Sequence, residues 1–146
     1  MHVPLGGALL MPLVAAILLA TPREDRRTWA AACLLQGAIL LGGLIAAAAG
    51  EDDGLAIQFL VDAEVIAAHE TAAHWFLAAA AATLVAFGVG FAGREMVRRR
   101  RAAAAALLLG LLTAGLGARA GHLGGQLVFE HGAVEAHQQG SPPPGG

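Results

Sequence analysis

Residues 28–50 read TWAAACLLQGAILLGGLIAAAAG and carry no formal charge. A helix needs about 20 apolar residues to cross the hydrocarbon core of a bilayer, and this run is long enough to do so. Similar runs cover residues 3–22 and 71–93, and a further run starts at residue 102. The pattern predicts an all-α membrane protein, a bundle of four transmembrane helices at about 3–22, 28–50, 68–93 and 102–125.

The composition of the whole chain agrees with a membrane protein. Of 146 residues, 57% are hydrophobic and 14% are charged, and the mean hydropathy is +0.64. A soluble domain carries roughly 25% charged residues. All 9 basic residues are Arg and the net charge is -2, with no basic stripe among aromatic residues, so nucleic acid is excluded as a partner. We expect the chain to lie in a lipid bilayer.

The connections between the predicted spans differ in the basic residues that they carry. Residues 23–27 carry three Arg and residues 94–101 carry five, whereas residues 51–70 and the C-terminal tail carry none. The positive-inside rule therefore predicts that both Arg-rich connections face the cytoplasm and that the N-terminus and the C-terminus lie outside. The outward segments carry the acidic residues Glu51, Asp52, Asp53, Asp62, Glu64, Glu70, Glu130 and Glu135.

Two segments lie outside the spans. The connection 51–70 alternates acidic and apolar residues, and we expect a short interfacial helix there, between the second and third spans. Residues 138–146 are rich in Gly and Pro, so we expect a disordered tail. Residues 1–137 then form a single transmembrane domain.

The histidines are predicted to converge at one depth. Counted from the cytoplasmic ends at about 1.5 Å per residue, His2, His74 and His122 lie about 27 to 30 Å along their spans, and His69 about 36 Å. His131 lies further out. Imidazole is a good ligand for haem iron, Cu and Zn, and ionisable residues at membrane depth are commonly functional. We expect His69 and His122, from the third and fourth spans, to be the axial or metal ligands, with His2 and His131 in reserve.

The fourth span offers a place where a flat group could approach. Gly117, Gly121 and Gly125 repeat every fourth residue, which creates a face without side chains. The same repeat also serves close helix packing, and that alternative stays open. Arg119 precedes His122 by one helical turn and would bind a haem propionate, pair with a glutamate, or extend to the interface.

Three short motifs support a family assignment: residues 2–5 (HVPL) before the first span, His69-Glu70 at the start of the third, and residues 124–132 (GGQLVFEHG) closing the fourth. Together they resemble the bacterial membrane family known as domain of unknown function 2231. Phe129 stands where that family often has Tyr, and Val3 replaces an aromatic residue. Related domains are joined to c-type cytochrome or Rieske-like segments, so the resemblance implies redox work at the outer face.

The resulting hypothesis is a multi-pass protein of the bacterial inner membrane that binds haem b and exchanges electrons with a periplasmic redox protein such as a c-type cytochrome. We expect no independent catalytic activity, because His69 and His74 lack the spacing of a zinc protease and no nucleophile motif is present. The alternatives are a scaffold or accessory subunit without a cofactor, and a Cu or Zn protein using the same histidines. Whether the chain forms homo- or hetero-oligomers is left open.

Overall fold

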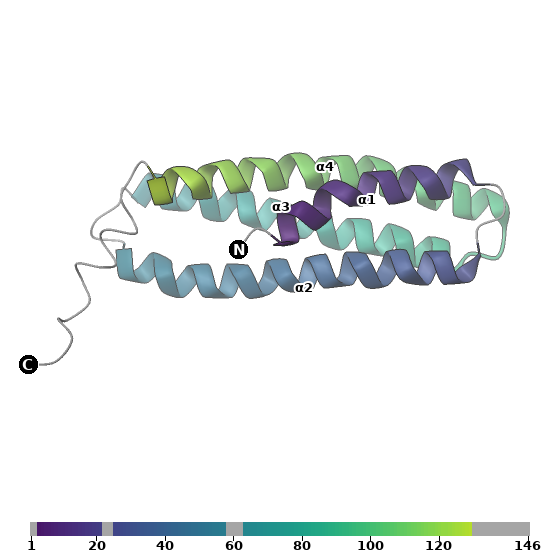
Figure 1. Cartoon of the computed structure of the whole chain (residues 1–146), viewed down its shortest axis with the longest axis horizontal. Coiled ribbons are helices and arrows are strands. Elements are labelled where there is room, and N and C mark those ends of the chain that lie inside the picture. Colours follow the sequence, from purple (N-terminus) through teal and green to yellow (C-terminus); the bar gives the residue numbers. More distant parts are fainter. Residues whose placement is uncertain (1–2, 22–24, 58–62, 130–146) are drawn as a thin grey trace, which may run out of the picture.

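The computed structural model of the chain describes residues 3–21, 25–57 and 63–129. These residues form four α-helices, α1 (Val3–Ala20), α2 (Arg26–Ile57), α3 (Ala63–Ala92) and α4 (Met96–Phe129). Helices that follow one another run antiparallel and form one elongated bundle (Figure 1). The predicted all-α class and the bundle of four helices are therefore confirmed.

Three of the helices are long and apolar enough to cross a membrane, over Arg26–Gly50, Ala63–Ala92 and Met96–Gln126. The fourth, α1, contributes a shorter apolar stretch, Gly6–Ala20. Large apolar side chains such as Leu34 (76% exposed) and Leu108 (69% exposed) point away from the bundle. A surface of this kind suits lipid and would be a liability in water. The chain is thus a small, multi-pass integral membrane protein.

The helices pack around a ring in the order α1, α2, α3, α4. The most extensive packing joins α3 to α4, while α1 lies against α4 and α2, and α2 against α3. Because α1 has 18 residues and α4 has 34, α1 covers only part of its neighbour. Figure 1 shows α1 beside the end of the bundle that holds the α1–α2 and α3–α4 connections. At the opposite end, α2, α3 and α4 extend beyond α1.

Pro12 sets the register of α1 on α4. Its Cγ lies 3.5 Å from the position that a Cβ on Gly110 would occupy. Val3 lies about nine residues before Pro12, or about 13 Å along the axis, which brings the start of α1 to the level of about residue 119 of the antiparallel α4. Gly121 and Gly125 therefore lie beyond the described start of α1.

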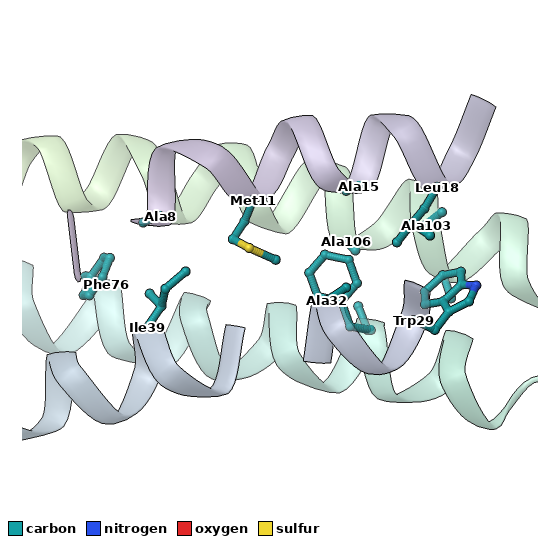
Figure 2. Packing of buried hydrophobic residues seen from close by; sticks show 13 residues of the cluster. Ala8, Met11, Ala15, Leu18, Trp29, Ala32, Ile39, Phe76, Ala103 and Ala106 are labelled. Atoms are coloured by element: carbon teal, nitrogen blue, oxygen red, sulfur yellow. The ribbon is translucent and has the colours of Figure 1, made fainter. Parts of the chain in front are cut away.

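The core is built mainly from alanines with a few large side chains between them (Figure 2). Small residues let helix backbones approach closely, which favours packing in lipid. The largest buried side chain, Trp29 of α2, meets Phe87 of α3 edge to face, with ring centroids 6.3 Å apart. Leu18 of α1 and Ala103 of α4 belong to the same buried cluster as Trp29 (Figure 2).

Charged residues close the helices at that end. The Asp25 carboxylate accepts a hydrogen bond from the backbone N–H of Arg27 at 3.3 Å, which caps the start of α2. Arg99 donates from Nε to the carbonyl of Gly93 at 2.9 Å, just after α3 ends. The Arg26 guanidinium lies 4.5 Å from the ring centroid of Phe91. The Arg-rich connections therefore have local structural roles besides any effect on orientation.

Among the residues described on either side of the gap at 58–62, the expected interfacial helix does not form a separate element. Residues 51–57 continue α2, and α3 already begins at Ala63. An unbroken helix keeps its backbone hydrogen bonds internal, and alanine and the acidic residues here do not interrupt it as proline would. The predicted disordered tail, 138–146, lies outside the described residues.

Candidate functional site

Among the three histidines that the structure describes, His69 is the one that lies between two helices. It is half-buried on α3, and its Nδ1 lies 3.1 Å from the backbone carbonyl of Ala120 on α4. Its ring also lies over Gly124, where an added Cβ would come within 3.0 Å of Cε1. The absence of a side chain at Gly124 therefore makes room for the imidazole between α3 and α4.

The contact with Ala120 defines which ring nitrogen carries the proton. A carbonyl oxygen only accepts hydrogen bonds, so Nδ1 must be the donor. In the neutral imidazole this leaves Nε2 with its lone pair. Histidines that bind metals have the same arrangement, in which one nitrogen donates to a carbonyl and the other is available to the metal.

His122 does not share this position. Its side chain is exposed, although it lies only two residues from both Ala120 and Gly124. Two residues correspond to about 200° around a helix axis, so His122 and the surface that contacts His69 lie on opposite sides of α4. Within one chain the structure does not bring His69 and His122 together, and their pairing stays a prediction.

The remaining histidines add no partner to His69 within the described residues. His74 is exposed, and its Nδ1 lies 2.8 Å from the carbonyl of Glu70 on its own helix. His2 and His131, the reserve ligands, lie outside the described residues. In the described part of the chain, no three His, Cys, Asp or Glu side chains gather as a metal site would require.

Two of the three glycines of the predicted face, Gly121 and Gly125, lie on the part of α4 beyond the described start of α1. Gly117 is buried, whereas Gly121 and Gly125 are half-buried. A Cβ added to Gly125 would meet no heavy atom within 4 Å. The helix-packing alternative therefore has no support at Gly125. The glycine that receives His69 is Gly124, which the spacing rule did not select.

Arg119 does not share the contact that α4 makes with His69. Its side chain is exposed and lines a cavity of about 370 Å³ between α3 and α4, together with Leu116, Glu64, Thr71 and Trp75. Neither His69 nor His122 lines this cavity. Arg119 therefore does not share this cavity with either of the two histidines predicted as ligands.

A buried polar layer escaped the sequence analysis. Gln36 is 1% exposed, and its Nε2 donates to the carbonyl of Ala80 at 2.9 Å. Thr83, three residues after Ala80 on α3, has its Oγ1 atom 3.1 Å from the Oγ1 atom of Thr113 on α4, and this hydrogen bond links the two helices. A glutamine in the middle of an uncharged span was the available signal, because polar residues at that depth are rarely without a role.

The comparisons with known proteins agree with the motifs. Residues 1–137 match the family described as "Predicted membrane protein (DUF2231)". No curated protein and no solved structure matches the chain. Because the match covers nearly the whole chain, the protein belongs to the DUF2231 family of membrane proteins.

Proposed function

We propose that the protein is a b-type haem-binding electron-transfer subunit, with His69 Nε2 as an axial ligand to the haem iron. The observation that supports this most directly is the hydrogen bond between His69 Nδ1 and the Ala120 carbonyl. It fixes the orientation of the ring and, in the neutral imidazole, places the proton on Nδ1 and leaves Nε2 available for a metal. When bound, the haem would take up and release one electron at a time.

The number of available ligands favours haem over a bare metal ion. Zinc sites use three or four protein side chains, and no such group occurs among the described residues. The porphyrin supplies four of the iron's ligands, so haem needs only one or two protein side chains, and several haem proteins use a single proximal histidine. His69 alone satisfies the smaller requirement.

The surroundings of His69 also suit a flat, largely apolar group. Beyond the start of α1, the bundle consists of three helices, and Gly125 presents open space on the side of α4 that α1 leaves uncovered. Small residues of this kind allow a macrocycle to approach the backbone. His2, which is bonded to the first residue of α1, and His131 are the candidates for a second ligand. His122 would serve only from outside this space.

The orientation of the protein belongs to the same proposal. With both Arg-rich connections in the cytoplasm, His69 lies at the outward end of the bundle, in the periplasmic half of a bacterial inner membrane. Exposed acidic side chains at that end, Glu64 and Glu70, would attract a basic partner such as a small c-type cytochrome.

A second function, a scaffold without a cofactor, is favoured by the same contact. The bond from His69 to Ala120 joins the two helices that pack most extensively, and the ring fills the space over Gly124. A histidine that only holds α3 to α4 would need no free Nε2. The two functions differ in what happens when haem is supplied.

The test uses two variants of the full chain, purified in detergent after expression with added haem. His69→Ala should lose the Soret band and the α and β bands of the reduced spectrum. His74→Ala is the matched control, because it removes an exposed histidine of the same helix and should keep the wild-type spectrum. Far-ultraviolet circular dichroism confirms that both variants are folded. An unchanged spectrum in folded His69→Ala would eliminate His69 as a ligand.

A further inference from the structure

The residues that line the cavity beside Arg119 are partly apolar and partly charged, which suits an amphipathic ligand. The volume of the cavity is about 370 Å³, and it lies between α3 and α4, where His69 is not one of its lining residues. Much of its wall is apolar and comes from small residues and one leucine, Ala67, Ala68, Ala72 and Leu116. Two charged side chains, Arg119 and Glu64, also line it. A wholly apolar or a wholly polar ligand would leave part of this lining unmatched.

The position of Arg119 along α4 indicates how deep in the membrane the cavity lies. Arg119 lies about 25 Å from Ala102 along α4, close to the boundary between the acyl chains and the headgroups of the outer leaflet. The side chain is exposed and forms no ion pair within the described ranges 3–21, 25–57 and 63–129. At this depth the guanidinium faces the headgroup region, and its planar geometry matches phosphate oxygens in pairs.

The other polar lining residues agree with a headgroup. Trp75 is 63% exposed and lines the cavity, and tryptophan rings favour the membrane interface. Thr71 adds a hydroxyl group. Glu64 lies further towards the outer end of the bundle than Arg119, since it is the second residue of α3. Along the bundle axis the cation therefore lies nearer the lipid core and the anion nearer the outer end, with the small apolar residues of the wall between and beside them.

We infer that the cavity binds one phosphatidylethanolamine molecule of the outer leaflet. The phosphate binds Arg119, the ammonium group faces Glu64, and an acyl chain extends inward along Ala72 and Leu116. A carboxylate has about four acceptor sites, so Glu64 can receive the ammonium besides its existing contact. The order of charges matches a zwitterionic headgroup, whereas an anionic phosphatidylglycerol headgroup would place a neutral glycerol against Glu64.

The test is native mass spectrometry of the full-length protein in detergent with equimolar phosphatidylethanolamine and phosphatidylglycerol. We expect one bound lipid, with phosphatidylethanolamine preferred. Arg119→Gln should weaken its binding by about tenfold, the loss of a charge-assisted contact. Arg100→Gln is the matched control, because it removes an exposed arginine of the same helix far from the cavity and should bind as the wild type does. Glu64→Gln should remove the preference between the two headgroups.

Fluorescence provides a second readout that does not depend on detergent. In vesicles where a minor fraction of the lipid carries brominated acyl chains, Trp75 should be quenched more strongly by brominated phosphatidylethanolamine than by the same fraction of brominated phosphatidylglycerol, and Arg119→Gln should remove this difference while buried Trp29 remains unaffected. Equal binding of both lipids by the wild type, or full phosphatidylethanolamine binding by Arg119→Gln, would overturn the inference. Neither result would affect the haem proposal, because His69 does not line the cavity.

Discussion

Only one of the two polar groups of the buried Gln36 side chain has a hydrogen-bond partner among the described residues. Its Nε2 donates to Ala80 across the α2–α3 contact, but within the described part of the chain its Oε1 is buried and has no hydrogen-bond partner. An unsatisfied buried acceptor costs about 1–3 kcal/mol, whereas a neutral hydrogen bond contributes about 1 kcal/mol. In this position the amide therefore costs at least as much stability as it contributes.

Replacement of Gln36 by Met should leave the thermal midpoint in detergent unchanged or raise it. Methionine has a similar length and removes the unmatched oxygen together with the single hydrogen bond. Gln36→Ala serves as the comparison and should lower the midpoint, because it leaves a cavity. A marked drop for Gln36→Met would mean that Oε1 has a partner in the membrane.

Among the helices, α2 and α3 approach most tightly where Trp29 lies over Gly90. A Cβ on Gly90 would overlap three atoms of the indole ring. The ring is fully buried and cannot move aside, so only glycine fits this position. By contrast, a Cβ on Gly88, two residues away on the same helix, would meet no atom within 4 Å.

This difference predicts opposite effects for two identical substitutions. Gly90→Ala should destabilise the protein by about 1–3 kcal/mol or more, because the overlap forces α2 and α3 apart. Gly88→Ala should stabilise it by about 0.5–1 kcal/mol, since alanine is the better helix former. Thermal unfolding of both variants in the same detergent measures the difference. Equal behaviour of the two would show that Trp29 does not pack against Gly90.

At the scale of the whole molecule, charge is distributed unevenly along the bundle axis. Arg94 and Arg98–Arg101 lie around the start of α4, and Arg26 and Arg27 start α2 at the same end. The opposite end carries Glu64 and Glu70 near the start of α3. This asymmetry is what the positive-inside rule uses to orient a membrane protein.

Orientation can be tested with single cysteines in a Cys33→Ala background, because Cys33 is the only cysteine in the chain. We expect Ser141→Cys to react with a membrane-impermeant maleimide on intact spheroplasts. Glu95→Cys, in the α3–α4 connection, should react only after lysis. The reverse pattern would place His69 and the lipid cavity at the cytoplasmic side and would exclude a periplasmic redox partner.

The sequence was sufficient to predict where the helices lie, but not which side of each helix faces the interior of the bundle. Uncharged runs located four helices, whose observed bounds differ from the expected spans mainly by extra turns outside the apolar core, as in α2 and α4. Depth along a helix follows from counting residues, which is why His69 and His122 were placed at similar heights. Helices that are apolar all round carry no pattern that reveals their inward side. Therefore the exposure of His122 could be determined only from the structure, which shows how α4 packs against α3.

The most direct test of the central claim is the absorption spectrum of purified wild-type protein, recorded oxidised and then after reduction with dithionite. We predict a Soret band that shifts on reduction, with α and β bands appearing in the reduced protein. A featureless spectrum from folded protein that was expressed with ample haem would contradict the claim and leave the scaffold function.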